Sequence, residues 1–254
     1  MVPPVRSTAK VALVPIAAAL ATCVLAVPAA TAAAPPPAAI EFAAADGLLL
    51  HGTYWAAAKP GPAMLLLHQC NRAHSSWAPL AEAFARAGVH VLAFDFRGFG
   101  ASKSERVGEF QAESDRLWPD YPSDVDRAIG YLRTLPDVDG KRLGVLGASC
   151  GGSQTLLVAL REPKVRAIGF LSSSLPWLDE GDLVQFEKNS ALPILAIASE
   201  EDAETLARAK RLFDRSSDPH SKLIVYKGKL HGVPLFEHDP GLVDSIVAWF
   251  TDRL

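Results

Sequence analysis

Residues 142–152 read Arg-Leu-Gly-Val-Leu-Gly-Ala-Ser-Cys-Gly-Gly and place Ser149 at the centre of a Gly-x-Ser-x-Gly pattern. The apolar residues before the pattern predict a strand over 143–147, and those after it predict a helix over 152–161. A serine on such a tight turn projects its hydroxyl beyond the sheet, and small neighbours avoid clashes in the crowded backbone. The first N–H groups of the helix point to the same place, where negative charge can develop. Ser149 is therefore the candidate nucleophile, and a glycine-rich turn that only packs is the alternative.

The length and composition predict one globular domain with a full hydrophobic core. The chain has 254 residues, a formal net charge of -3, and 49% hydrophobic residues. There is no basic excess of the kind that nucleic-acid-binding proteins carry, so no nucleic-acid partner is expected.

The N-terminal segment differs from the rest of the chain. Its first ten residues include two basic and no acidic side chains, residues 11–27 are apolar and alanine-rich, and Ala30-Thr31-Ala32 offers a cleavage site. This pattern predicts a signal peptide over 1–32, followed by a Pro/Ala-rich linker over 33–38. We expect an exported protein, periplasmic or secreted, with no stable membrane span after cleavage. A retained membrane anchor and a lipid attached at Cys23 are the alternatives.

Strand-like and helix-like segments alternate over 39–254, which predicts an α/β domain with a mostly parallel sheet covered by helices on both faces. Asp46-Gly47 predicts a turn between the first two strands, which start the sheet as an antiparallel hairpin. The stretch 97–121 is expected to be irregular and to overlie the site. The expected strands are 39–44, 48–55, 63–68, 89–96, 143–147, 167–172, 194–199 and 223–226, and the main expected helices are 76–87, 123–135 (capped by Ser123), 203–213 and 241–250.

Functional side chains gather at the carboxyl ends of the strands in such a sheet. His231 follows the last expected strand and is the candidate base, because a serine hydroxyl needs a base near neutral pH and histidine can serve as one. Asp202 follows a late strand and is the candidate acid that orients the imidazole. The neighbouring Glu200 and Glu201 are alternatives for the acid, and so is Asp95.

Taken together, these motifs resemble the α/β-hydrolase family. The resemblance covers essentially 39–254, and the order serine, acid, histidine is the order of that family. The chain looks most like the dienelactone-hydrolase-like branch, and the short segment between Ser174 and Pro193 leaves no room for a large cap domain. The residues that carry the resemblance are His68-Gln69, Asp95 to Gly100, Gly147 to Gly152, Glu201-Asp202 and His231-Gly232. One departure is Gln69, because many relatives have His-Gly where this chain has His68-Gln69.

The resemblance implies a hydrolase that cleaves ester-type acyl bonds of a small molecule, with no cofactor and no metal. Two backbone N–H groups would stabilise the oxyanion: that of Cys150, and that of Cys70 or Gln69 in the loop after the third strand. In an oxidising compartment Cys70 and Cys150 could form a disulfide that locks these two loops together. Two separate buried cysteines are the alternative.

Two other functions remain open at this point. Dienelactone hydrolases use a cysteine nucleophile, and Cys150 stands beside the serine. Gly147 and Gly151 nevertheless bracket Ser149 symmetrically, which favours the serine. A catalytically silent binding protein with the same fold is the second alternative, although binding alone does not require a serine, an acid and a histidine together.

Overall fold

The computed structural model describes residues 33–176, 178–188 and 191–254. The expected signal peptide over 1–32 lies outside the described residues. Within the described ranges, no helix is both long enough and apolar enough to cross a membrane.

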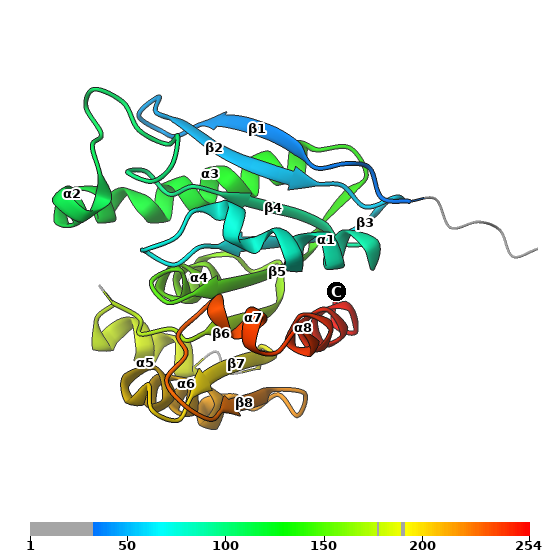
Figure 1. Ribbon diagram of the computed structural model, residues 1–254, viewed down its shortest axis with the longest axis vertical. Coiled ribbons are helices and arrows are strands. Elements are labelled where there is room, and N and C mark those ends of the chain that lie inside the picture. The colour runs from blue at the N-terminus through cyan, green and yellow to red at the C-terminus, as the bar shows by residue number, and fades with distance from the viewer. Residues whose placement is uncertain (1–32, 177, 189–190) are drawn as a thin grey trace, which may run out of the picture. The chain divides into compact units, whose positions relative to one another are not determined.

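The described residues form an eight-stranded sheet with the order β1-β2-β4-β3-β5-β6-β7-β8 (Figure 1). β1 pairs with β2 and β2 with β4 in antiparallel fashion, and all other neighbours are parallel. The predicted mostly parallel sheet with an antiparallel start is therefore confirmed. The strands are β1 (Ala38–Ala43), β2 (Leu49–Trp55), β3 (Gly61–Leu67), β4 (His90–Phe94), β5 (Val138–Ala148), β6 (Val165–Leu171), β7 (Ile194–Ser199) and β8 (Lys222–Tyr226).

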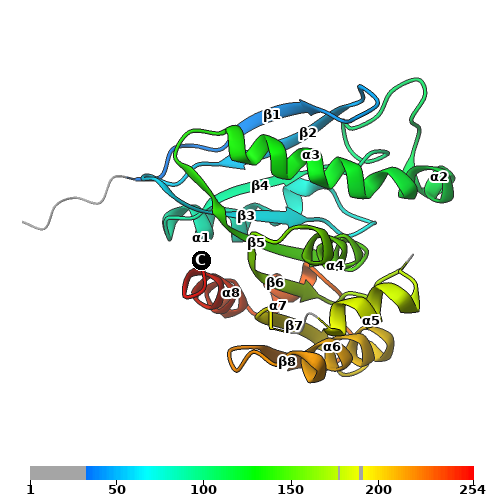
Figure 2. The same cartoon turned by 180° about the vertical axis from the view of Figure 1, so that it is seen from behind.

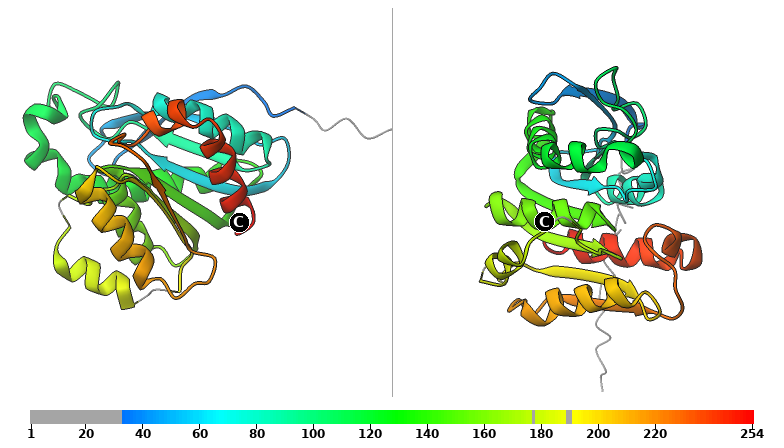
Figure 3. Two further views of the ribbon diagram at one scale, coloured as in Figure 1. Left: turned by 60° about the horizontal axis from the view of Figure 1, so that its bottom comes forward. Right: turned by 90° about the vertical axis from the view of Figure 1, so that its left-hand side faces the viewer.

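Helices cover both faces of the sheet, as Figures 2 and 3 show. The α-helices are α1 (Ala78–Arg86), α2 (Phe110–Leu117), α3 (Tyr121–Thr134), α4 (Gly151–Arg161), α5 (Glu180–Lys188), α6 (Ala203–Arg215), α7 (Pro234–His238) and α8 (Gly241–Thr251), with 3-10 turns η1 (His74–Trp77) and η2 (Trp118–Asp120). Alternate residues of a strand face opposite sides, so β3 contributes to two cores. Leu65 and Leu67 belong to one core, which also holds residues of α3, α4, α5 and α6, whereas Met64 and Leu66 belong to a second core with residues of α1, α7 and α8.

The stretch 97–121 and the helix that follows it differ from the prediction. The stretch 97–121 contains α2, of which only Phe110 and Leu117 are buried, so that its apolar periodicity is weak. The next helix begins at Tyr121 and not at Ser123, because η2 leads into it directly. Ser123 is not its cap, and its hydroxyl donates to the carbonyl of Asp120 at 3.0 Å. In the segment between β6 and β7, the described residues contain only the short α5, in agreement with the expected absence of a large cap.

An ion cluster centred on the buried Arg97 holds the loop after β4 in place. The Arg97 side chain is 3% exposed and makes a two-pronged contact with Asp124 of α3, with distances of 2.6 Å from Nε and 2.7 Å from Nη2. Its Nη1 donates to Asp120 at 2.7 Å and to Asp46 in the β1–β2 turn at 3.0 Å. Arg97 thus ties the loop after β4 to both α3 and the opening hairpin.

Candidate active site

Ser149 occupies the turn between β5 and α4, at the carboxyl end of a central strand. Its φ of +50° lies in the left-handed region, a strained conformation for a residue with a side chain. The turn is held by the Ser149 N–H, which donates to the Leu171 carbonyl at 2.9 Å. A Cβ at Gly151 would lie 2.3 Å from the Leu67 carbonyl oxygen, and a Cβ at Gly147 would lie 2.3 Å from the Gly151 carbonyl oxygen. Close backbone packing therefore explains both glycines of the motif.

The structure brings Ser149, His231 and Asp202 together. His231 Nε2 lies 2.8 Å from Ser149 Oγ, and His231 Nδ1 lies 2.6 Å from Asp202 Oδ2. Because an ionised carboxylate can only accept a hydrogen bond, Nδ1 carries the proton and donates it to Asp202. The lone pair of the neutral ring is then on Nε2, facing the serine hydroxyl. This is the arrangement in which the imidazole can take the hydroxyl proton.

Among the three neighbouring acidic residues, only Asp202 reaches the imidazole. Glu200 and Glu201 are exposed, and their backbone N–H groups extend the pairing with the β8 side through the carbonyls of Tyr226 and Gly228. Asp202 comes next, as the residue that precedes α6. Its side chain is 19% exposed and that of His231 is 36% exposed, so solvent can still reach the pair.

Cys70 and Cys150 are joined by a disulfide, with their Cα atoms 5.8 Å apart. The bond connects the loop after β3 to the residue that follows Ser149. In the described part of the chain, the N–H groups of these two cysteines donate to no backbone carbonyl or side chain. Neither N–H is therefore engaged by another described residue.

His68 connects the loop after β3 to the loop after β4. Its Nε2 accepts the N–H of Phe96 at 3.0 Å, so its Nδ1 carries the proton and donates to the Gln69 carbonyl at 2.9 Å. Burial lowers the pKa of His68 to about 4, although the bond to that carbonyl acts in the opposite direction. His68 therefore stays neutral near pH 7 and holds the loop in one conformation.

Asp95, the alternative acid, lies outside the group around Ser149. Its Oδ1 accepts the N–H of His74 at 2.8 Å and lies 2.9 Å from Nδ1 of the same residue. His74 Nε2 lies 3.0 Å from the hydroxyl of Thr53. The three residues line an open pocket of about 350 Å³ beside β1 and β2. Asp95 also packs against Gly100, where a Cβ would lie 1.9 Å from its Oδ2, and so supports the loop after β4.

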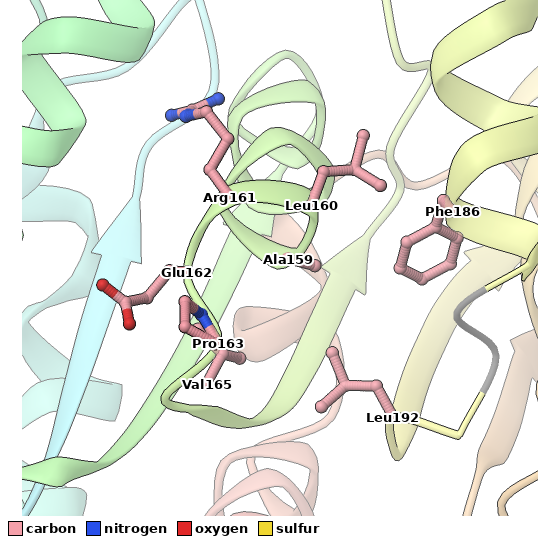
Figure 4. A pocket seen from close by; sticks show the side chains of 8 residues that line it. All are labelled: Ala159, Leu160, Arg161, Glu162, Pro163, Val165, Phe186 and Leu192. Carbon is pink, nitrogen blue, oxygen red and sulfur yellow. The ribbon is translucent and has the colours of Figure 1, made fainter.

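A further open pocket, of about 410 Å³, lies at the opposite end of the sheet (Figure 4). Its walls are the α4–β6 connection, α5 and the segment that precedes β7. It therefore lies at the amino ends of β6 and β7. Its lining residues are Ala159, Leu160, Arg161, Glu162, Pro163, Val165, Phe186 and Leu192. Ser149, His231 and Asp202 do not line this pocket. Among the described residues, no group of three or more His, Cys, Asp or Glu side chains is placed to hold a metal ion.

A model of the α/β-hydrolase fold family matches residues 62–206, which is more than half of the chain. The chain belongs to the α/β-hydrolase family. The match includes β3 from its second residue, the Ser149 turn and Asp202, and the resemblance seen in the sequence is thereby confirmed.

Relatives in the family include a thiohydrolase of Aspergillus aculeatus, 31% identical over 130 residues, which are 51% of this chain and 39% of that protein. An uncharacterized protein of Mycobacterium tuberculosis is 25% identical over 226 residues, or 82% of this chain and 76% of its own length. The matches to the fungal thiohydrolases and a polyketide transferase span less than half the length of each of those proteins.

Solved structures share the fold at low sequence identity. The α/β hydrolase GrgF from a Penicillium species has a TM-score of 0.69 at 18% identity, covering 86% of this chain and 99% of that one. A dienelactone hydrolase from Anabaena variabilis also has a TM-score of 0.69, at 20% identity, covering 87% and 99%. The α/β-hydrolase architecture predicted from the sequence is confirmed.

Proposed function

We propose that the protein is a serine hydrolase that cleaves ester-type acyl bonds of small molecules through an acyl-enzyme. The observation that carries the proposal is the hydrogen-bonded series from Asp202 through His231 to Ser149, with Ser149 on a strained turn. Membership in the α/β-hydrolase family supports it.

In the first half of the reaction, Ser149 Oγ attacks the acyl carbonyl carbon while His231 Nε2 takes the hydroxyl proton. The tetrahedral intermediate collapses as His231 returns that proton to the leaving group, which departs as an alcohol or a thiol. In the second half, His231 takes a proton from water, the resulting hydroxide attacks the acyl-enzyme, and the proton returns to Ser149 as the acid leaves. Asp202 keeps the ring in the required tautomer and stabilises its charged form.

The oxyanion of both intermediates would be held by backbone N–H groups of Cys150 and Cys70, with Gln69 as the alternative donor in the same loop. Such a donor lowers the barrier by roughly 3 kcal/mol when it is held at the position of the developing charge. The disulfide joins the two loops that carry the proposed donors. It therefore supports a preorganised site.

Two other functions are less consistent with these contacts. A cysteine nucleophile at Cys150 would need a free thiolate, whereas its sulfur is bonded to Cys70. A catalytically silent binding protein has no need of an imidazole with its lone pair directed at a serine hydroxyl.

Thiohydrolases among the relatives favour thioesters as a second substrate class beside oxygen esters.

The test is hydrolysis of matched acyl substrates by the wild type, by Ser149→Ala and by Cys70→Ala/Cys150→Ala. An oxygen ester and a thioester with the same short acyl chain separate the two substrate classes. We expect turnover by the wild type, none above background in Ser149→Ala, and residual turnover in the double cysteine variant. Equal turnover by the wild type and Ser149→Ala would refute a serine mechanism.

We also propose that the protein is exported, with residues 1–32 as its signal peptide. The disulfide supports this proposal, because disulfides persist mainly in oxidising compartments. Cell fractionation followed by intact-mass measurement tests it: an exported product that begins near residue 33 is the expected result. Full-length protein confined to the cytoplasm would contradict it.

A further inference from the structure

We propose that Gln69 is a positioning residue, whose side chain holds the segment 231–233 against the loop after β3. This inference rests on the proposed function, since it concerns how the catalytic base is placed. It assigns to the Gln69 side chain a role separate from the donor role considered for its backbone N–H.

Gln69 reaches from one loop to another that is remote in sequence. Its Oε1 accepts the N–H of Val233 at 2.9 Å, across a sequence separation of 164 residues. Because an N–H can only donate, this bond fixes which end of the Gln69 amide faces Val233. The Nε2 end donates to Asn71 Oδ1 at 2.6 Å, within the loop that also carries Cys70. Gln69 is 2% exposed, so its amide is withdrawn from water and depends on these partners.

The same amide packs on the backbone directly after the proposed base. Gly232 has a φ of +72°, and a Cβ there would lie 2.1 Å from Gln69 Oε1. The chain after His231 therefore turns in a left-handed conformation that brings Gly232 onto the amide and directs the Val233 N–H to its oxygen. The positions of Gly232 and Val233 determine how the backbone leaves His231.

The carbonyl of Gln69 is fixed as well, because it accepts from His68 Nδ1 at 2.9 Å and from the Arg72 N–H at 3.0 Å. The side chain thus extends from a braced backbone. The loop after β3 carries both Gln69 and Cys70. Because Cys70 is bonded to Cys150, this loop is also joined covalently to the residue after Ser149. A displacement of about 1 Å between base and nucleophile can cost about a hundredfold in rate.

A set of variants at Gln69 separates positioning from packing. Gln69→Met keeps the length and volume but cannot bond to Val233, whereas Gln69→Glu keeps an acceptor for the Val233 N–H. We expect kcat to fall about tenfold in Gln69→Met with little change in KM, and to recover at least half of that loss in Gln69→Glu. Hydrogen exchange at the Val233 amide, read by NMR, should accelerate in Gln69→Met and be restored toward the wild-type rate in Gln69→Glu.

The outcomes distinguish this inference from the proposed function. If the wild type hydrolyses the acyl substrate and Gln69→Met retains its kcat and its slow Val233 exchange, the positioning role is refuted while the serine mechanism stands. If kcat falls equally in both variants but Val233 exchange is unchanged, the positioning role is also refuted. An inactive wild type overturns the proposed function, and the exchange of Val233 still tests the contact itself.

Discussion

Removal of the Cys70–Cys150 disulfide should destabilise the fold and also slow the reaction. The bond closes a loop with a sequence separation of 80 residues. The chain-entropy relation for a loop of this size gives about 4.5 kcal/mol of stabilisation, through restriction of the unfolded chain. We therefore expect Cys70→Ala/Cys150→Ala to lower the free energy of unfolding by about 4 kcal/mol.

The assay is urea unfolding followed by tryptophan fluorescence, on protein that begins at residue 33, in which Cys70 and Cys150 are the only cysteines. The matched control is the protein with both cysteines, unfolded after a dithiol reductant has cleaved the disulfide. Its urea midpoint should lie near that of the double variant. A stability loss below about 1 kcal/mol would refute the entropic reasoning. Because the bond joins the two proposed donor loops, kcat should fall at least tenfold in conditions where the variant remains folded. An unchanged kcat would show that the bond stabilises the fold without ordering the oxyanion site.

Further predictions concern the acid and two buried polar groups. Asp202→Asn should lower kcat by about 10⁴-fold, as loss of the correct tautomer does in other triads, whereas Glu201→Gln should change kcat less than twofold. Steady-state kinetics that gave the larger loss in Glu201→Gln would identify Glu201 as the acid instead. The pKa of His68 is about 4 in the folded protein and about 6.5 in the unfolded chain. Between these two pH values the unfolded chain binds a proton at His68 that the folded protein does not, so acidification should lower the free energy of unfolding by roughly 3 kcal/mol. Urea titrations of His68→Asn should lack this loss. Asp124→Asn should cost about 3 kcal/mol in the same assay, because it removes the buried negative charge that pairs with Arg97 and leaves the carboxylates of Asp46 and Asp120, which are more than half exposed. A loss near zero would contradict that burial argument.

The sequence allowed most of the sheet to be predicted because its strands are short apolar runs with clear boundaries. The expected strand 194–199 coincides with β7, which Pro193 precedes and three acidic residues follow. The helix Phe110–Leu117 could not be predicted in the same way. Only its two terminal residues are buried, and the residues between them are mostly polar. Tertiary packing, and not local periodicity, places that segment.

The candidate site was predictable where chemistry and chain order restrict the choice. Ser149 and His231 follow strands in the order of the family, and the structure brings them within 2.8 Å. Asp202 is the candidate acid on the sequence alone, with Glu200 and Glu201 as alternatives, because a shift of one residue reverses the direction of a side chain. In the structure Asp202 Oδ2 lies 2.6 Å from His231 Nδ1. The Gln69 contact with Val233 left no local signal, since its partners are 164 residues apart.

The most direct test of the serine mechanism is covalent labelling with a fluorophosphonate, read by intact mass and peptide mapping. The reagent phosphonylates a serine only when a base removes its proton and the oxyanion is stabilised. We predict one adduct per chain, located on Ser149, and none in Ser149→Ala. An adduct of equal yield in Ser149→Ala, or a folded wild-type protein that hydrolyses the acyl substrate while Ser149 stays unlabelled, would contradict the serine mechanism.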